Sequence, residues 1–203
     1  GRIEDAKVAW KDAIDISDTN SDSWAHLGEV QVMLGEGESA LKSLDRAIRL
    51  NERNAFAFFQ KGLAWRSLSE WSKDVEAFER VVAIEDDNAE AWNYLGEGQM
   101  HMRGRMEDAL GSFERAISKS PGFKAAHANK VESLLKLDRA GEAADAADRL
   151  LSLDKKNAQA WVLRGRALHK LGQPEDAIGA YRKAIDLKPE YADAWYRMGV
   201  SLE

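Results

Sequence analysis

The sequence contains no cysteine and only three prolines among its 203 residues. Without cysteine, the chain can form no disulfide, no thiolate nucleophile and no cysteine-ligated zinc site. It also has no run near the ~20 apolar residues that a membrane-spanning helix needs, and no visible signal peptide. We therefore expect no membrane partner, and we take the cytoplasm as the default location.

A strong charge of one sign is missing as well, since 29 basic and 35 acidic residues give a net charge of -6. Proteins that bind nucleic acid gain affinity when Lys and Arg displace counterions from phosphates, so this balance argues against a nucleic-acid partner. Hydrophobic residues make up 44% of the chain and charged residues 32%. Such a composition is typical of helices with one buried face and not of a disordered chain.

What the chain does have is an internal repeat. One column, with steps of 34, 34, 35, 34 and 34 residues, is mostly tryptophan: Trp24, Phe58, Trp92, His127, Trp161 and Trp195. A glycine follows four residues later in every copy except the fourth, where Val131 stands. A second column with the same steps is mostly alanine: Ala6, Ala40, Asp74, Ala109, Ala143 and Ala177. A larger residue follows each of these by four positions, except at Ala147.

Both halves of a copy place apolar residues at helical spacing, as in Trp24, Leu27 and Leu34. Short breaks separate the halves, for example Gly35-Glu36-Gly37 and Gly172-Gln173-Pro174. Glycine allows a left-handed helix cap, and proline fits the first turn of the helix that follows. The pattern predicts an all-α fold built from paired helices.

These columns resemble the tetratricopeptide repeat (TPR), whose signature contains Trp, Leu-Gly, Ala, an aromatic residue, Ala and Pro. The resemblance implies a right-handed superhelical α-solenoid of antiparallel helix hairpins, with about twelve helices. A single TPR array would span residues 1–203. Five full repeats would occupy 21–54, 55–88, 89–123, 124–157 and 158–191. Residues 1–20 would hold the second helix of a truncated repeat, and 192–203 the first helix of another.

Neither end of this predicted array shows a polar capping helix, so we expect the chain to be a fragment of a longer TPR array. We predict a non-catalytic scaffold that binds a peptide or protein segment in a concave groove. Two alternatives stay open. The chain could be an assembly module that self-associates through its uncapped terminal repeats, or it could be a regulatory domain of a larger enzyme.

By the same resemblance, the first helix of each repeat lines the concave groove. The residues we predict to contact a partner there are Glu29, Phe56, Phe59, Leu63, Arg66, Asn93, Glu97, Arg166, Lys170 and Tyr196. Phe56, Phe59 and Leu63 would form an apolar patch, while Arg166, Lys170 and Arg197 would make a basic floor. The net charge changes accordingly, from -7 over residues 1–88 to +1 over 89–203.

We therefore expect the ligand to be an extended or helical peptide, with an apolar anchor at Phe56 and Phe59 and basic flanks. In the alternative interpretation, Phe59 packs inside its own repeat. Family members that grip a C-terminal carboxylate need Lys and Asn at fixed groove positions. The columns that should supply them here hold neither the two lysines nor the asparagine after the glycine, so we reject that mode.

Nothing in the sequence indicates catalysis, a metal or another cofactor. The four histidines include no pair at i and i+4, and no glycine-rich phosphate loop follows a strand. His127 stands in the tryptophan column, where we expect it to fill space and not to bind a metal.

Overall fold

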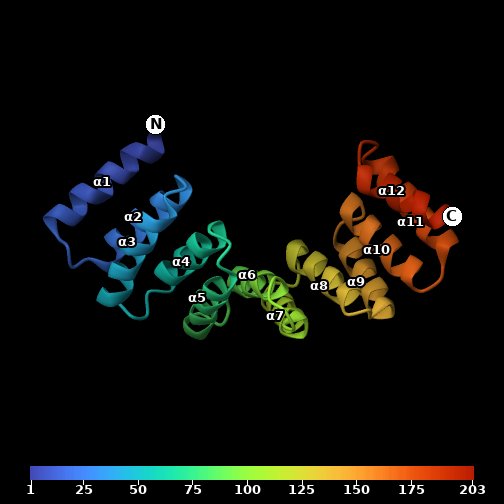
Figure 1. Cartoon of the computed structure of the whole chain (residues 1–203), viewed down its shortest axis with the longest axis horizontal. Coiled ribbons are helices and arrows are strands. Elements are labelled where there is room, and N and C mark those ends of the chain that lie inside the picture. Colours follow the sequence, from blue (N-terminus) through green and yellow to red (C-terminus); the bar gives the residue numbers. More distant parts are fainter. The chain divides into compact units, whose positions relative to one another are not determined.

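The computed structural model describes all residues from 1 to 203 and contains twelve α-helices (Figure 1). Their bounds are Arg2–Ile16 (α1), Ser21–Met33 (α2), Gly37–Leu50 (α3), Ala55–Ser67 (α4), Trp71–Ile84 (α5), Ala89–Met100 (α6), Met106–Lys119 (α7), Lys124–Lys136 (α8), Ala140–Leu153 (α9), Ala158–Lys170 (α10), Pro174–Leu187 (α11) and Ala192–Leu202 (α12). The predicted all-α fold with about twelve helices is confirmed. None of the helices has the length and apolar character needed to cross a membrane.

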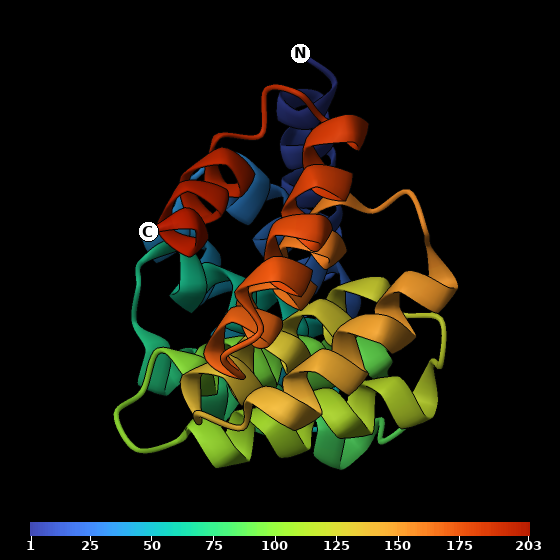
Figure 2. The same ribbon diagram turned by 90° about the vertical axis from the view of Figure 1, so that its right-hand side faces the viewer.

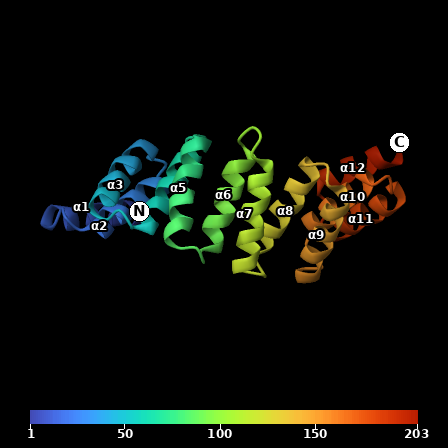
Figure 3. The same cartoon turned by 90° about the horizontal axis from the view of Figure 1, so that it is seen from below.

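The helices form two compact units, residues 1–102 with α1–α6 and residues 103–203 with α7–α12. Within each unit, successive helices pack as antiparallel hairpins that also contact the next hairpin along the chain. The α2–α3 and α4–α5 hairpins belong to the first unit, and α5 also packs beside α6 (Figure 3). The α8–α9 and α10–α11 hairpins belong to the second unit, where α10 and α11 appear in orange tones in Figure 2.

The turns inside the four hairpins are three residues long, and each needs one residue with a positive φ. Glycine supplies it at Gly35 and Gly172, with φ of 74° and 73°. Ser69 and Asp138 adopt the same conformation, with φ of 59° and 60°, although L-residues disfavour it. The connection from α6 to α7 is longer and holds Gly104 at φ 78°, so it can accommodate the extra residue of the third copy.

Asparagine is the N-cap residue of four helices, α2, α4, α6 and α10. The side chains of Asn20, Asn54, Asn88 and Asn157 each accept a hydrogen bond from a backbone N–H in the first turn of α2, α4, α6 and α10. These helix caps satisfy donors that have no partner inside the helix. Asn54 does more, because its Nδ2 also donates to Ser21 Oγ at 2.8 Å and Asp22 Oδ1 at 3.1 Å on α2.

The core of a hairpin depends on a small residue opposite a large one. A Cβ atom placed on Gly28 would lie 2.5 Å from Cγ of Leu44, and one placed on Gly165 would lie 2.4 Å from a ring carbon of Tyr181. In the α8–α9 hairpin the sizes are exchanged, since Val131 and Ala147 stand at the equivalent positions and both are fully buried. The two exceptions in the repeat columns therefore compensate each other.

The tryptophan column is held by a second recurring contact. The indole N–H of Trp24, Trp92, Trp161 and Trp195 donates to the backbone carbonyl six residues earlier, at 2.8 to 3.0 Å. His127 copies this bond, with Nε2 placed 2.9 Å from the carbonyl oxygen of Pro121. Since a carbonyl only accepts, Nε2 must carry the proton there.

Candidate functional site

Three aromatic rings from α1, α2 and α4 contact one another in series in the first unit. Trp10 of α1 stacks on His26 of α2 with ring centroids 4.8 Å apart, and His26 contacts the ring of Phe56 on α4 at 4.8 Å. Phe56 is still 36% exposed. Glu29 is half-buried next to this stack, where its carboxylate lies 3.0 Å from Nδ1 of His26. The ring of Phe56, the predicted apolar anchor, therefore packs against His26 and keeps part of its surface exposed to solvent.

Phe59 is placed differently from Phe56. Its ring meets the edges of Phe78 at 5.3 Å and Tyr94 at 5.6 Å, and it packs with the half-buried Leu63 on the core of the α4–α5 hairpin. This position agrees with the alternative interpretation, in which Phe59 packs inside its own repeat. Part of the ring remains accessible, so Phe59 contributes both to the core and to the surface.

Phe56 and Phe59 share an open depression of about 320 Å³. Its other lining residues come from the start of α4 and from the segment that enters α6: Ala55, Gln60, Glu85, Asn88 and Glu90. The two glutamates are exposed and form an acidic rim, while Phe56, Phe59 and Ala55 supply apolar surface beside the buried amide of Gln60. Such a site suits an apolar side chain that is flanked by cationic ones.

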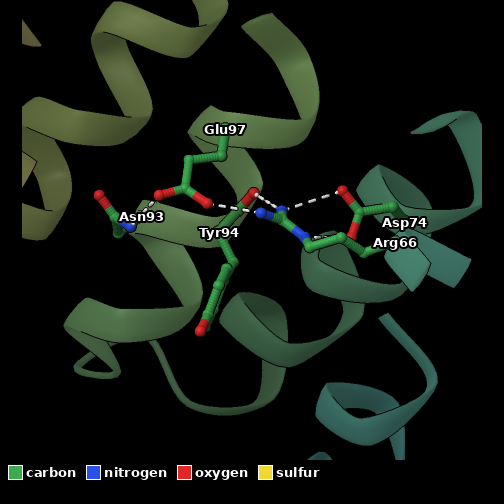
Figure 4. Close-up of polar contacts among 5 residues, drawn as sticks. All are labelled: Arg66, Asp74, Asn93, Tyr94 and Glu97. Atoms are coloured by element: carbon green, nitrogen blue, oxygen red, sulfur yellow. Dashed lines mark hydrogen bonds and ion pairs between the residues drawn. The ribbon is translucent and has the colours of Figure 1, made fainter. Parts of the chain in front are cut away.

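Arg66 lies at the centre of a polar network between α4, α5 and α6 (Figure 4). Its guanidinium bonds both carboxylate oxygens of Asp74, at 3.3 and 3.1 Å, and reaches Glu97 Oε2 at 2.5 Å. It also donates to the carbonyl oxygen of Tyr94 at 2.7 Å. Asn93 is buried on α6 and donates from Nδ2 to Glu97 Oε1 at 2.8 Å. Three predicted groove residues are therefore linked within the protein, because Glu97 accepts a hydrogen bond from both Arg66 and Asn93.

Aromatic rings enclose the same guanidinium. Arg66 Cζ lies 4.7 Å from the ring centroid of Tyr94 and 5.6 Å from that of Phe78, both within cation–π range. Trp71 is 5.9 Å away and stacks on His101, with centroids 3.8 Å apart. Since only 20% of its side chain is exposed, Arg66 serves mainly to join three helices.

Asp74 is the unusual member of this network, because it replaces alanine in a small-residue column and has no exposed surface. Space for it comes from Gly98 on α6, where an added Cβ would lie 2.3 Å from Asp74 Oδ2. Burial raises the pKa of Asp74 to about 6, although the neighbouring Arg66 opposes this by favouring the charged form. The sequence signalled this site through the Asp74 substitution, which we did not read as functional or structural.

The second unit brings together the remaining predicted residues. Arg166 and Lys170 of α10 and Tyr196 of α12 line one open depression of about 300 Å³, together with Arg197 and His169. The cations are largely paired. Arg166 bonds Glu132, Lys170 Nζ lies 2.6 Å from Asp138 Oδ1, and Arg197 Nε lies 2.9 Å from Asp193 Oδ2.

These ion pairs neutralise much of the positive charge that the sequence predicted for the basic floor. The hydrogen bond and charge of Lys170 lower the pKa of the exposed Asp138 carboxyl, so that pair is charged near neutral pH. Burial raises the pKa of the Tyr181 phenol, which therefore remains a neutral lining group. The surface combines paired charges with the exposed ring of Tyr196, which is 70% accessible.

Helical hairpins that repeat along the chain, with small–large pairs in their cores, define a helical-repeat protein. Models of the tetratricopeptide repeat match residues 75–123, 100–167 and 165–203. The chain is therefore a tetratricopeptide-repeat protein. Repeats of this kind typically mediate protein–protein contacts and are usually non-catalytic.

Two curated relatives and one solved structure illustrate the similarity. The general transcriptional corepressor trfA of Dictyostelium discoideum is 33% identical over 109 residues, which cover 54% of this chain and 8% of trfA. The peroxisomal targeting signal receptor of Candida albicans is 24% identical over 210 residues, or 98% of this chain and 35% of the receptor. The crystal structure of YrrB, described as a TPR protein with an unusual peptide-binding site, superposes with a TM-score of 0.82 at 20% identity.

The YrrB comparison covers 93% of this chain and 96% of YrrB, and it supports the fold. By contrast, the chain spans only about a third of the length of the targeting signal receptor and less than a tenth of trfA. The activities and partners of those whole proteins therefore do not transfer to this chain by similarity alone.

Proposed function

We propose that this protein is a non-catalytic scaffold that binds a peptide or a protein segment on the surface formed by the first helix of each repeat. The main site would be the depression between α4 and α6, where Phe56 offers a partly exposed ring that packs against His26. The single observation that carries the proposal is this combination of a partly exposed aromatic anchor, apolar surface and an acidic rim.

The ligand that fits this site has one apolar side chain with Lys or Arg next to it. The apolar group would enter the depression beside Phe56, and the cations would meet Glu85 and Glu90 on the rim. Charges at an exposed rim affect association rate and salt dependence more than they affect affinity. We expect the ring contact to provide most of the binding free energy.

The second unit offers a further contact surface around Tyr196, Arg166 and Lys170. Because these two cations already pair with Glu132 and Asp138, binding an acidic group there would require exchange of ion pairs. We therefore propose Tyr196 as the principal contact of that surface. Arg66, Asn93 and Glu97 would contribute by fixing the helices that carry the first site.

The names of two similar proteins bear on the proposal that the ligand is a peptide or a protein segment. One relative is named as a receptor for a targeting signal, and one structural neighbour is described as having a peptide-binding site. The second of these descriptions agrees with a peptide as the ligand of this chain. This likeness agrees with the chemistry of the α4–α6 depression and does not identify the partner.

Selection from a random peptide library displayed on phage, with the whole chain as bait, tests this proposal. Selected peptides should share an apolar residue next to Lys or Arg. Fluorescence anisotropy then compares their Kd for the wild type, Phe56→Ala and a control, Leu187→Ala, whose side chain on α11 is 41% exposed. Phe56→Ala should raise Kd by about fivefold or more, as loss of a central aromatic contact usually does.

The control should bind with unchanged affinity, and circular dichroism should show that both variants keep their helix content. A Glu90→Gln variant should bind slightly more weakly and with a smaller dependence on salt concentration. Selected peptides that bind equally well to wild type and Phe56→Ala would show that the α4–α6 depression is not the binding site.

A further inference from the structure

Two depressions lie at equivalent repeat positions in two different hairpins. One, of about 190 Å³, lies between α4 and α5 and is lined by Phe58, Lys61, Trp65, Lys73, Glu76, Ala77 and Arg80. The other, of about 160 Å³, lies between α8 and α9 and is lined by Ile117, His127, Lys130, Leu134, Glu142, Asp145, Ala146 and Arg149. Apart from Ile117, every residue of the second set follows its counterpart in the first by 69 positions, which is two repeats.

Both depressions coincide with a break in the tryptophan column. Phe58 and His127 are the two members of that column whose ring is smaller than an indole. His127 keeps the bond to the backbone carbonyl that the tryptophans make, so its ring is anchored in the same way. The smaller ring therefore leaves space in the hairpin without displacing the column.

The chemistry around the two spaces is matched except at one rim position, where Lys73 of the first site corresponds to Glu142 of the second. Each has an apolar floor, with Ala77 and Trp65 in one and Ala146 and Leu134 in the other. Each has a lysine three residues after the column position, which pairs with a carboxylate of the preceding helix. Lys61 lies 2.8 Å from Asp45, and Lys130 lies 2.7 Å from Glu114.

An exposed arginine completes each rim. Arg80 and Arg149 occupy the same repeat position, and neither forms an ion pair. Arg80 already lies over an aromatic face, with Cζ 5.3 Å from the ring centroid of Phe58, and Lys73 Nζ lies 4.3 Å from that of Trp65. The arginine that both rims share favours a ligand that presents a π face over one that is merely apolar.

We propose that these two depressions are binding sites for the phenyl or phenol ring of a Phe or Tyr side chain on a partner protein. The size supports a single six-membered ring, because a cavity of about 150 Å³ is large enough to hold benzene. The rim of paired lysine and unpaired arginine supports an aromatic ring over an aliphatic group. Neither site shares a lining residue with the α4–α6 depression.

The test uses N-acetyl-phenylalaninamide as a probe for a ring in a peptide, and backbone amide chemical shifts of the whole chain as the readout. Saturable shifts should appear around both depressions, with Kd on the order of 1 mM. His127→Trp should weaken binding at α8–α9 by about tenfold or more and leave α4–α5 unchanged. Phe58→Trp should do the reverse, so each variant controls for the other.

Two further probes complete the design. N-acetyl-leucinamide should bind more weakly than the phenylalanine probe at both sites, and equal affinity would refute recognition of a ring. Phenol that binds where N-acetyl-phenylalaninamide does not would show a site for free small molecules and not for side chains. Absence of saturable shifts in the wild type, or binding at α8–α9 that survives His127→Trp, would overturn the proposal. Restoring the tryptophan of the column should preserve folding, which thermal unfolding by circular dichroism would check.

Discussion

The exchange of sizes between Gly28–Leu44 and Val131–Ala147 leads to a quantitative prediction. The two pairs occupy equivalent repeat positions, and they contain the same number of side-chain carbon atoms. A swap of Gly28→Val with Leu44→Ala should therefore conserve volume in the α2–α3 hairpin. Each change alone should be harmful, whereas the two together should be tolerated.

The structure gives the size of each effect. Gly28→Val places a Cβ 2.5 and 2.6 Å from Cγ and Cδ2 of Leu44, and such overpacking costs about 1–3 kcal/mol. Leu44 has no exposed surface, so Leu44→Ala should cost about 2–5 kcal/mol. A volume-conserving exchange usually costs less than about 1.5 kcal/mol. The double variant should thus be more stable than the sum of the single effects by about 1.5 kcal/mol or more.

Urea unfolding of the four proteins, followed by far-UV circular dichroism, measures this coupling energy. A double variant whose loss of stability equals the sum of the two single losses, within about 0.5 kcal/mol, would refute the reasoning. In that case Val131 and Ala147 would be tolerated for reasons other than mutual fit. Gly111→Ala is a suitable control, because no atom lies within 4 Å of the position its Cβ would take.

Three further predictions concern single side chains. Because the pKa of Asp74 is raised in the folded protein, its carboxyl binds a proton more readily there than in the unfolded chain. The stability of the wild type relative to Asp74→Asn should therefore fall by up to about 3 kcal/mol as the pH rises from about 4 to about 7. Urea unfolding across this pH range measures the difference. Asn157→Ala should cost about 1 kcal/mol through loss of a helix cap, and Asn54→Ala should lower the melting temperature further because it also loses bonds to α2. Ser69→Gly should raise the melting temperature through relief of its positive φ, and should do so more than Asp138→Gly, because aspartate tolerates that conformation.

The helices could be predicted from the sequence because they follow from local patterns. Apolar residues at i, i+3 and i+4 and glycine at the turns act over a few residues, and six copies in the same order reinforce one another. The asparagine caps carried a signal of the same kind, at steps of 34 residues from Asn20 to Asn54 and Asn88, and we did not read it. The positive φ of Ser69 and Asp138 could have been found from their alignment with Gly35 and Gly172.

The candidate site was harder to predict, because it depends on side-chain directions across helices. Position in the repeat placed Phe56 and Phe59 in one region, but only packing shows that Phe59 meets Phe78 and Tyr94. Similarly, Arg66 was predicted as a groove residue on position alone. Its bonds to Asp74 on α5 and to a carbonyl of α6 follow from three-dimensional proximity, which a column of aligned residues does not encode.

The pairing of helices with their neighbours also bears on how the chain folds. Every pair of helices that packs closely is separated by at most one other helix along the chain. Only short loops must close before such contacts form, so the entropic barrier to the first hairpin is small and folding should be rapid. During synthesis, α2 and α3 can pack together while α5 is still being made. In the growing chain, the apolar face of each helix can pack against a helix that is close in sequence. Apolar surface is therefore exposed only briefly, which limits aggregation during synthesis.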